Sequence, residues 1–348
     1  MRIFYHLSEY VSHRVSGLDF ADCLRLLGHV VSHVPEDAAA SDLAVLHDDP
    51  LNYAGVYERC PALRALPVAA FCVWESDMLP RAYGEALRPV QAVWTPSHFS
   101  RAALARWYPE TRVLPHVVRR VKTSREDLEF AAAALGAREK SFRFFSIIDA
   151  INPRKNVSAL LAAFASLRAV AARPVVLVLK QYRNSFDLSR VPGVISIDGE
   201  LSAGRMAALH ILCDAYVSAH HSEGWGLGLS EAMAFGKPVL ATGWSGNMEF
   251  MDEENSFPVP YGLSRVSAEM CRRIPLFTPD MTWADIDLDA LVNIMRRVLE
   301  GRTPPRLSEK AAAIAVRFGP KSAAGRLSEL LRELCRASPS PQPAPFGD

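Results

Sequence analysis

The sequence predicts two α/β domains, each built around a parallel sheet. Short apolar runs alternate with amphipathic helical stretches along most of the chain. The apolar runs are nearly continuous, which is typical of parallel strands that helices cover on both faces. The length of 348 residues suits two domains of ordinary size better than one core.

The first series of elements occupies residues 1–120, the predicted N-terminal domain. A helix is predicted in "DFADCLRLLGH", because Phe20, Leu24 and Leu27 fall on one helical face and Gly28 can end it. Strands are predicted in "MRIFYHL", "DLAVLH", "PVAAFCVW" and "QAVWTPS".

A charged segment with a helical pattern and no strand signal, residues 121–140, is predicted to connect the domains. The second series, residues 141–318, contains strands in "FRFFSII", "PVVLVLK", "GVISIDG", "AYVSAHH" and "KPVLATG". A helix over residues 319–336 is expected to pack back on the N-terminal domain. The Pro-rich tail, residues 337–348, is expected to be disordered or extended.

Composition excludes several classes of protein. The chain has 39 basic and 38 acidic residues, which argues against a nucleic-acid binder with a basic surface. Its six cysteines are scattered without a C-x-x-C pair, so a reducing cytoplasm is expected rather than disulfides or a zinc site. Residues 1–30 lack the pattern of a signal peptide, and no segment approaches the ~18 apolar residues of a membrane span.

Charge is uneven within the first domain. Residues 1–80 are acidic, whereas residues 81–122 are rich in arginine and include Trp107 and Tyr108. The basic stretch predicts either a solvated helical face or peripheral contact with a membrane on its cytoplasmic side. Contact of that kind would bring the protein to anionic lipid or to a lipid diphosphate.

The most informative stretch is "SEGWGLGLSEAMAFG", which predicts a strand end, a glycine-rich loop and a helix. The strand "AYVSAHH" should end near His220 or His221, one of which lines a cleft or packs inside. The helix should run from about Gly226 to Gly236. Glycines let a ligand approach the loop backbone, and the free N–H groups at the helix start form an anion site.

Two carboxylates flank this anion site. Glu231 lies one turn into the helix on the face of Leu227, where its oxygens suit the two hydroxyls of a ribose. Glu223 precedes the anion site and would meet the group beyond the phosphate, which gives the order sugar, diphosphate, ribose. From spacing alone, an ordinary strand–turn–helix with Glu231 in the first turn for dipole reasons accounts for the pattern equally well.

A second basic element, "DAINPRKN", follows one predicted strand and precedes a helix. Arg154 and Lys155 are expected at the mouth of a cleft, where they can neutralise a diphosphate without a metal. The alternative is a solvated basic turn in which Asn156 caps the helix.

Acidic residues elsewhere in the sequence also have either a functional or a structural explanation. Glu75 follows the strand "PVAAFCV", where its carboxylate can orient a hydroxyl of a bound sugar or of a second substrate. The alternative there is a helix N-cap by Ser76 or Asp77. The D-x-D patterns of "ADIDLDA" open an amphipathic helix, where the helix dipole favours acidic residues, so no essential metal is predicted.

One family resembles this sequence closely. The segment "SAHHSEGWGLGLSEAMAFGKPVLATGWSGNMEFM" resembles the E-x7-E signature of retaining glycosyltransferases of family four, which have the GT-B fold. "NPRKN" resembles the family's R-K element, and "VWESDMLP" with "VWTPSHF" resembles its N-terminal domain. "ENSFPVPY" and "WADIDLDALVNIMRRV" resemble a subgroup of bacterial cell-surface polysaccharide enzymes. The resemblance covers roughly residues 1–330.

The resemblance implies two Rossmann-like domains and a metal-independent, retaining transfer of a hexose from a UDP- or GDP-sugar. The acceptor would be a hydroxyl of a glycan or lipid-linked molecule, and no cofactor other than the sugar nucleotide substrate is implied. The leaving diphosphate would help to deprotonate the acceptor on the same face of the sugar. The implied catalytic residues are Glu223, Arg154 and Lys155; Glu75, from its place after a strand, is predicted to join them by orienting an acceptor hydroxyl or the transferred sugar. The implied donor-binding residues are Glu231, Gly224, Trp225, Gly226, Leu227, Gly228 and Gly17.

Three departures from the family pattern stand out. Trp225 replaces the usual Phe, and Asp149 stands where many members have a second phosphate-binding Arg, so that Arg154 would do that work. Gly17 is alone in the first N-terminal loop, where many members have a glycine pair.

Other functions remain open from the residues. A sugar-nucleotide epimerase of the same fold would use similar contacts but needs no acceptor, and a non-catalytic binding protein would hold the donor without turnover. A nicotinamide-dependent enzyme is disfavoured, because no G-x-G-x-x-G follows the first strand.

Overall fold

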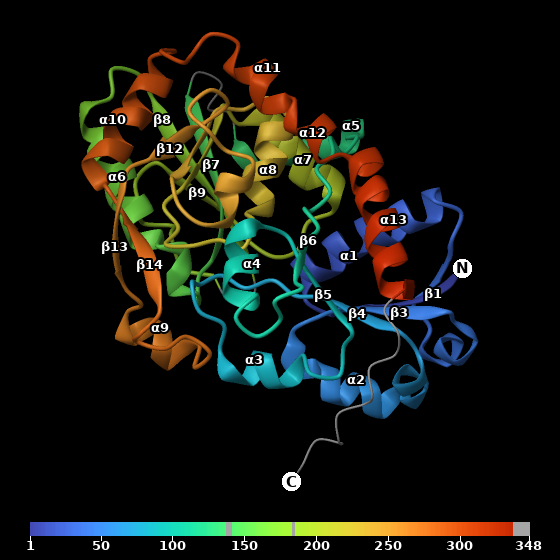
Figure 1. Ribbon diagram of the computed structural model, residues 1–348. Helices are drawn as coiled ribbons and strands as arrows, with labels where there is room; N and C mark the ends of the chain where they lie inside the picture. The colour runs from blue at the N-terminus through green and yellow to red at the C-terminus, as the bar shows by residue number, and fades with distance from the viewer. Residues whose placement is uncertain (137–140, 183–184, 337–348) are drawn as a thin grey trace. The chain divides into compact units, whose positions relative to one another are not determined.

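A computed structural model describes residues 1–136, 141–182 and 185–336 (Figure 1). The predicted tail and the last residues of the predicted connecting segment lie outside the described residues. The chain divides into two compact units. One comprises Met1–Val117 with the segment that begins at Phe318, and the other comprises Val118–Arg317.

The first unit is built on a six-stranded sheet in the order β2-β1-β3-β4-β5-β6, and every pairing in it is parallel. The strands are β1 Arg2–Leu7, β2 Val30–Ser32, β3 Leu43–His47, β4 Val68–Phe71, β5 Ala92–Thr95 and β6 Arg112–Val113. Both β3 and β4 are buried along their whole length, as the continuous apolar runs predict. The four predicted strands are confirmed, whereas the short β2 and β6 were not predicted.

Helices and 3-10 turns connect these strands. The α-helices are α1 Val11–Leu26, α2 Tyr53–Arg59, α3 Arg81–Ala86, α4 His98–Leu104 and α13 Pro320–Arg336, and the 3-10 turns are η1 Pro35–Ala40, η2 Pro50–Asn52 and η3 Pro61–Ala65. The last helix, α13, runs beside α1 (Figure 1). It buries Leu327, Leu330, Leu331 and Leu334 in the same apolar core as Phe20 of α1.

The prediction that Gly17 lies in a loop is wrong. The helix α1 begins at Val11, so Gly17 lies inside the helix and is buried. A Cβ atom at this position would lie 2.5 Å from Leu7 Cδ2 and 3.1 Å from His47 Nδ1. Gly17 is therefore explained by the close approach of α1 to the sheet, which outweighs its poor intrinsic helix propensity.

The second unit has a six-stranded sheet in the order β12-β11-β10-β7-β8-β9, and its pairings are parallel as well. The strands are β7 Phe142–Asp149, β8 Val175–Tyr182, β9 Val194–Ile197, β10 Ala215–Ser218, β11 Val239–Thr242 and β12 Phe257–Val259. The five predicted strands are confirmed. The short strand β12 was not predicted.

Ten helical segments surround this sheet in the described part of the unit. They are α5 Arg125–Leu135, η4 Pro153–Lys155, α6 Val157–Val170, α7 Ala203–Leu212, α8 Leu227–Ala234, η5 Gly246–Glu249, α9 Ala268–Arg273, α10 Leu288–Leu299, α11 Leu307–Ala312 and α12 Ile314–Arg317. The helix α5, expected within the connecting segment, packs on α7. There the guanidinium of Arg205 lies 4.3 Å from the centre of the Phe130 ring.

An antiparallel hairpin of β13 Tyr261–Arg265 and β14 Thr282–Ile286 stands outside the main sheet. The acids of "ADIDLDA" are divided between this hairpin and α10. Asp285 lies in β14, whereas the Asp287 carboxylate caps α10 by accepting from the Ala290 N–H at 2.9 Å. The prediction that Asp287 and Asp289 lie at the start of a helix is thus confirmed. The strand that contains Asp285 was not predicted.

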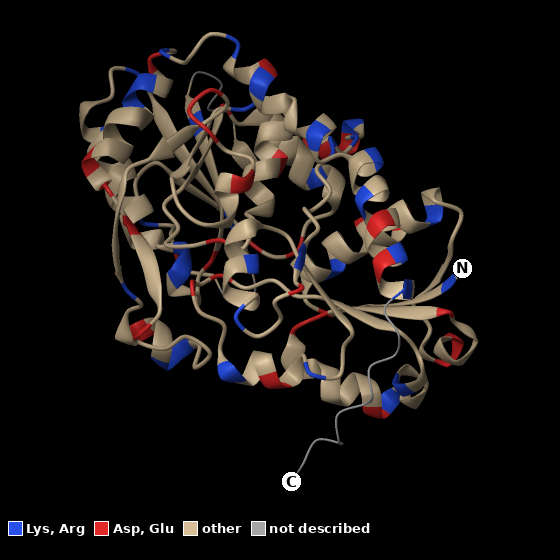
Figure 2. Cartoon of the chain, in the orientation of Figure 1, with Lys and Arg blue, Asp and Glu red and all other residues tan. Residues whose placement is uncertain are grey.

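The arginine-rich segment of the first unit is partly neutralised by ion pairs. Arg81 pairs with Glu85 at 2.7 Å, and Arg112 pairs with Glu110 at 2.8 Å and with Glu333 at 3.0 Å. Figure 2 shows a basic and an acidic position along the helix that Figure 1 labels α3, the element that carries the Arg81–Glu85 pair. In the part of the chain that the structure describes, no helix has the length and apolar character needed to cross a membrane.

Candidate functional site

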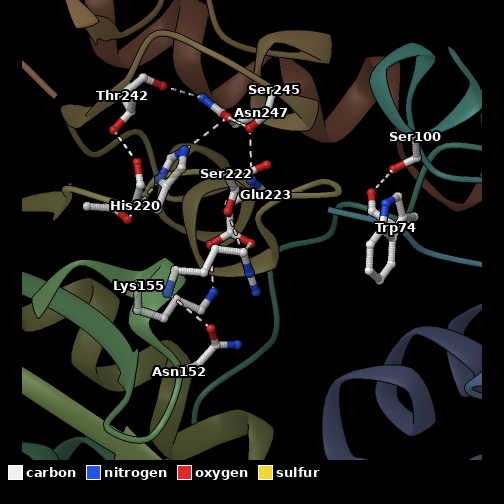
Figure 3. Close-up of polar contacts among 12 residues, drawn as sticks. Trp74, Ser100, Asn152, Lys155, His220, Ser222, Glu223, Thr242, Ser245 and Asn247 are labelled. Carbon is white, nitrogen blue, oxygen red and sulfur yellow. Dashed lines mark hydrogen bonds and ion pairs between the residues drawn. The ribbon is translucent and has the colours of Figure 1, made fainter. Parts of the chain in front are cut away.

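Two loops of the second unit meet beyond the carboxyl ends of β7 and β10. One loop leads from β7 into η4 and carries Arg154 and Lys155, and the other follows β10 and carries Glu223 (Figure 3). The His221 N–H donates to the Arg154 carbonyl at 2.8 Å, which joins the two loops through their backbones.

The first loop is shaped by its own asparagines. The Asn152 side chain accepts from the Arg154 N–H at 3.1 Å, and Asn156 adopts a left-handed conformation with φ 48° before α6 begins. The solvated-turn alternative is wrong. Arg154 is only 3% exposed, and the Asn156 side chain makes no capping hydrogen bond.

The two basic residues converge on one carboxylate. Glu223 Oε1 lies 2.6 Å from Lys155 Nζ, and Glu223 Oε2 lies 3.0 Å from Arg154 Nη1. The Arg154 guanidinium also donates to the Ser222 carbonyl. Burial raises the pKa of Glu223, but Lys155 and Arg154 outweigh it and hold that pKa well below its ordinary value. Glu223 is therefore a carboxylate at neutral pH.

The two cations differ in exposure. The Arg154 side chain is 4% exposed, whereas that of Lys155 is 23% exposed. Both were expected at the mouth of a cleft. The buried guanidinium instead lies beneath the Glu223 carboxylate, and Lys155 is the cation that solvent reaches.

A third segment, "WSGN", supports the Glu223 loop and was missed by the sequence analysis. The Glu223 N–H donates to Ser245 Oγ at 2.8 Å, and the Gly246 N–H donates to the Glu223 carbonyl at 2.8 Å. A Cβ at Gly246 would lie 2.1 Å from the Gly224 carbonyl oxygen, so glycine is needed there. The dipeptide "SG" was the available signal, since it marks a tight turn.

The side chain of His220 is packed inside the unit. Its Nδ1 lies 3.0 Å from Ser218 Oγ, and its Nε2 lies 3.1 Å from Asn247 Oδ1. Thr242 Oγ1 donates to the His220 carbonyl at 2.5 Å (Figure 3). Burial lowers the pKa of His220 to about 4, so the imidazole is neutral in the folded state. His220 thus stiffens the strand end beneath Glu223.

We expect the protein to lose stability in mild acid, because it contains buried histidines that are neutral in the fold. The pKa of His220 is lowered to about 4 and that of His116 to about 3, both by burial. The unfolded chain binds these protons below about pH 6.5, so the free energy of unfolding falls as the pH drops from there towards 4. His220 alone contributes roughly 3 kcal/mol to this loss. The check is urea unfolding at several pH values between 7 and 4.5.

The variant His220→Asn isolates this contribution. Its unfolding free energy should change less steeply between pH 6.5 and 4.5 than that of the wild type. Glu223 does not contribute to this slope, because its pKa is lowered in the fold. The free energy of unfolding that it provides is lost only when the pH falls below the ordinary carboxyl pKa. Equal slopes for both proteins would show that His220 is protonated in the fold.

The predicted helix after the glycine-rich loop is confirmed. Gly226 has φ 96° and precedes α8, and Gly236 has φ 70° just beyond its end. A Cβ at Gly228 would lie 2.6 Å from Tyr216 Oη and 2.9 Å from Ile147 Cδ1. The Leu229 N–H donates to the Gly226 carbonyl at 3.1 Å, so the N–H groups that lack an intrahelical partner at the start of α8 are those of Leu227 and Gly228.

The side chain of Trp225 faces the interior. It is 2% exposed, its ring centre lies 4.8 Å from that of Phe250, and its Nε1–H donates to Ser230 Oγ at 3.1 Å. The expected donor-binding role is therefore restricted to the backbone of this residue.

Glu231 points towards solvent one turn into α8, beyond its first turn. Its side chain is 41% exposed, and its Oε2 lies 3.5 Å from Nε2 of the buried His210 on α7. The carboxylate is accessible to a ligand at the same helix end as the free N–H groups.

The hairpin outside the sheet holds the same loop from another side. The His221 ring stacks on Trp283 of β14, with ring centres 3.9 Å apart and an angle of 11° between planes. His221 Nδ1 lies 2.8 Å from the Ala284 carbonyl, and the Ala284 N–H donates to the His221 carbonyl at 3.0 Å. The backbone that precedes Glu223 is thus held by both η4 and β14.

Glu75 lies in the first unit, after the carboxyl end of β4. Ser100 Oγ donates to the Trp74 carbonyl at 2.5 Å, and the Trp74 indole N–H donates to the Met78 carbonyl at 2.6 Å (Figure 3). These bonds fix the loop on both sides of Glu75, which is half-buried. The capping alternative is wrong, because α3 begins at Arg81 with Pro80 as its N-cap residue.

Metal-binding side chains do not gather near these loops. Within residues 1–136, 141–182 and 185–336, no group of three or more His, Cys, Asp or Glu is arranged to hold a metal ion.

Comparison with known proteins agrees with this geometry. Residues 133–256, which contain both loops and α8, match the family model described as "Glycosyl transferases group 1". The match covers the Glu223 loop, Glu231 and the Arg154–Lys155 turn. The match is confined to this part of the second unit. No curated protein matched the chain.

Solved structures show the fold. HepE from Anabaena, in complex with UDP and glucose, is 17% identical with a TM-score of 0.69, over 95% of this chain and 99% of that one. Sucrose-phosphate synthase from Thermosynechococcus elongatus is 16% identical with a TM-score of 0.65, over 97% and 99% of the chains. WaaG, a glycosyltransferase involved in lipopolysaccharide biosynthesis, is 13% identical with a TM-score of 0.63, over 95% of this chain and 99% of that one. The fold of this chain is GT-B.

Proposed function

We propose that this protein is a retaining glycosyltransferase that moves a hexose from a UDP- or GDP-sugar to a hydroxyl of a glycan or lipid-linked acceptor. One observation carries the proposal. Glu223 is ionised between Arg154 and Lys155, next to the start of α8, and Glu231 stands exposed one turn further along. The group 1 glycosyltransferase match over residues 133–256 and the UDP and glucose bound by HepE support it.

Each group of the donor has a partner of suitable chemistry. The accessible Lys155 ammonium and the free N–H groups at the start of α8 suit the diphosphate. Glu231 suits the ribose diol, because a carboxylate can accept from both hydroxyls. Glu223 suits hydroxyls of the transferred sugar. We assign buried Arg154 to holding Glu223 in place rather than to direct contact with phosphate.

The proposed reaction proceeds on one face of the sugar. The acceptor oxygen forms a bond to C1 as the bond from C1 to the diphosphate oxygen breaks, and the acceptor proton passes to that leaving oxygen. The protein's contribution is positioning and stabilisation of charge. Lys155 and the start of α8 stabilise the departing nucleoside diphosphate, whose negative charge grows as the bond breaks.

The first unit is proposed to serve the acceptor. Glu75, on its fixed loop after β4, is assigned to an acceptor hydroxyl. A role in cell-surface polysaccharide assembly, with peripheral contact to the cytoplasmic face of a membrane through residues 81–122, would bring the protein to a lipid-linked acceptor. The proposed membrane contact is based on Trp107, which is 41% exposed, and on the arginines around it.

The test is a turnover assay with UDP-, GDP-, dTDP- and CMP-sugars, after a thermal-shift screen has selected the donor. A glycosyltransferase releases the nucleoside diphosphate faster when a suitable glycan or lipid-linked acceptor is present. Conversion of the sugar nucleotide to an epimer without acceptor would establish the epimerase instead. Donor binding with no turnover across the acceptor panel would establish a binding protein.

Glu231→Ala is expected to weaken donor binding by more than the ~1 kcal/mol of an ordinary hydrogen bond, because a charged acceptor is lost. The side chain is half-exposed and packs little, so the fold should be retained. Calorimetric titration of the selected donor measures the effect. An unchanged dissociation constant would remove Glu231 from the ribose.

Activity is expected to survive EDTA, because Lys155 and the start of α8 can neutralise the diphosphate without a divalent ion. The rate of nucleoside diphosphate release is compared before and after chelation. Loss of activity with EDTA and recovery with Mn²⁺ or Mg²⁺ would contradict this expectation.

A further inference from the structure

His210 occupies an apolar position directly behind the exposed carboxylate of Glu231. It lies on α7, is 2% exposed, and its ring is surrounded by aromatic residues. The ring centres of Phe145, Tyr216 and Phe235 lie 5.0, 5.8 and 6.0 Å from that of His210. Such a position suits a phenylalanine at least as well, so the imidazole calls for an explanation.

Neither ring nitrogen of His210 has a hydrogen-bond partner among the residues that the structure describes, and both are buried. A neutral imidazole carries one N–H donor, and leaving a buried donor unmatched costs stability. Buried polar groups in native structures usually have a hydrogen-bond partner, so the unmatched imidazole of His210 calls for one.

The nearest charged acceptor lies on the ligand side. His210 Nε2 is 3.5 Å from Glu231 Oε2, which is longer than an ordinary N–H···O hydrogen bond. A shift of about half an ångström in the Glu231 side chain would form that bond. A carboxylate has about four lone-pair directions, so Glu231 can accept from His210 on one side and from a ribose diol on the other.

We propose that His210 is a positioning residue for the nucleotide ribose: its Nε2–H holds the Glu231 carboxylate when the 2′- and 3′-hydroxyls bind. This inference rests on the proposed function, because it assumes that Glu231 receives the ribose. His210 itself touches neither the ribose nor the reacting atoms. The buried donor restricts Glu231 to one orientation, which lowers the cost of ordering an exposed side chain on binding.

The experiment uses calorimetric titration of the full-length protein. The probes are whichever of UDP and GDP binds more tightly, and the 2′,3′-dideoxy analogue of the same nucleotide. The variants are His210→Phe, Glu231→Ala and the double variant, with His210→Gln as a conservative replacement that keeps a donor. Phenylalanine matches the aromatic surroundings of His210, so the fold should persist, and thermal unfolding checks this.

His210→Phe is expected to weaken the ordinary nucleotide about tenfold, the effect of one hydrogen bond to a charged group, and to leave the dideoxy analogue unchanged. The same substitution in the Glu231→Ala background should have no effect, because the partner is already absent. His210→Gln should recover part of the affinity.

Two results would overturn the role proposed for His210 and leave the proposed function intact. Equal weakening of both nucleotides by His210→Phe would indicate a packing role, and unchanged affinity for the ordinary nucleotide would indicate no role. If the wild type binds the ordinary and dideoxy nucleotides equally well, the ribose assignment of Glu231 in the proposed function fails together with the inference. That outcome is visible in the wild type before any variant is made.

Discussion

Glu223→Gln is expected to lower kcat by about 100-fold or more while the donor dissociation constant stays within a fewfold of the wild type. The carboxylate is ionised in the fold and held by Lys155 at 2.6 Å and Arg154 at 3.0 Å. The charge of the sugar changes mainly in the transition state, so losing this contact should affect kcat rather than binding. The amide keeps the shape of the side chain but only one of its two acceptor oxygens, so it can accept from Arg154 or from Lys155 and not from both.

The measurements are steady-state kinetics with the donor selected by binding and calorimetric titration of the same donor. Glu253→Gln is the matched control, because Glu253 is an exposed glutamate of the same unit, and it should leave both quantities unchanged. A near-normal kcat for Glu223→Gln would mean that the glutamate serves only to neutralise Arg154. A parallel loss of donor affinity would place Glu223 in ground-state binding.

Lys155→Ala is expected to weaken donor binding by about tenfold or more and to lower kcat as well. The ammonium is 23% exposed, so it can leave Glu223 partly and meet a diphosphate. Its charge acts on the bound donor and on the departing diphosphate, whose negative charge increases during the reaction. Titration of the nucleoside diphosphate and single-turnover kinetics separate the two effects.

Lys310→Ala serves as the control for charge alone. Lys310 pairs with Glu254 at 3.0 Å on the surface of the same unit, and its removal should leave donor affinity unchanged. If Lys155→Ala binds the diphosphate as tightly as the wild type, the cation that meets the phosphate lies elsewhere.

The main elements of both sheets could be predicted from the sequence because their strands are continuous apolar runs. The hairpin β13–β14 could not, since β13 is exposed along most of its length and carries no alternation of apolar and polar residues. The helical position of Gly17 could not be predicted either. Glycine suggests a loop by propensity, and only the approach of α1 to Leu7 and His47 explains it.

The composition of the site could be predicted better than its internal arrangement. Glycine spacing and strand ends indicated Glu223, Glu231, Arg154 and Lys155, and the structure brings Arg154 and Lys155 onto Glu223. Nothing in the order of residues distinguishes the buried Arg154 from the accessible Lys155, because η4 decides which neighbour points inward. His210 lies more than ten residues before the motif and meets Glu231 only through the packing of α7 against α8.

We infer that the edge of the second unit binds the nucleoside diphosphate part of a sugar donor. Calorimetric titration of UDP and GDP into the wild type, Glu231→Ala, Lys155→Ala and Lys310→Ala tests this inference. We expect one of the two nucleotides to bind once per chain, with affinity reduced in Glu231→Ala and in Lys155→Ala and preserved in Lys310→Ala. Binding of neither nucleotide to the wild type, or equal affinity in all four proteins, would contradict the claim.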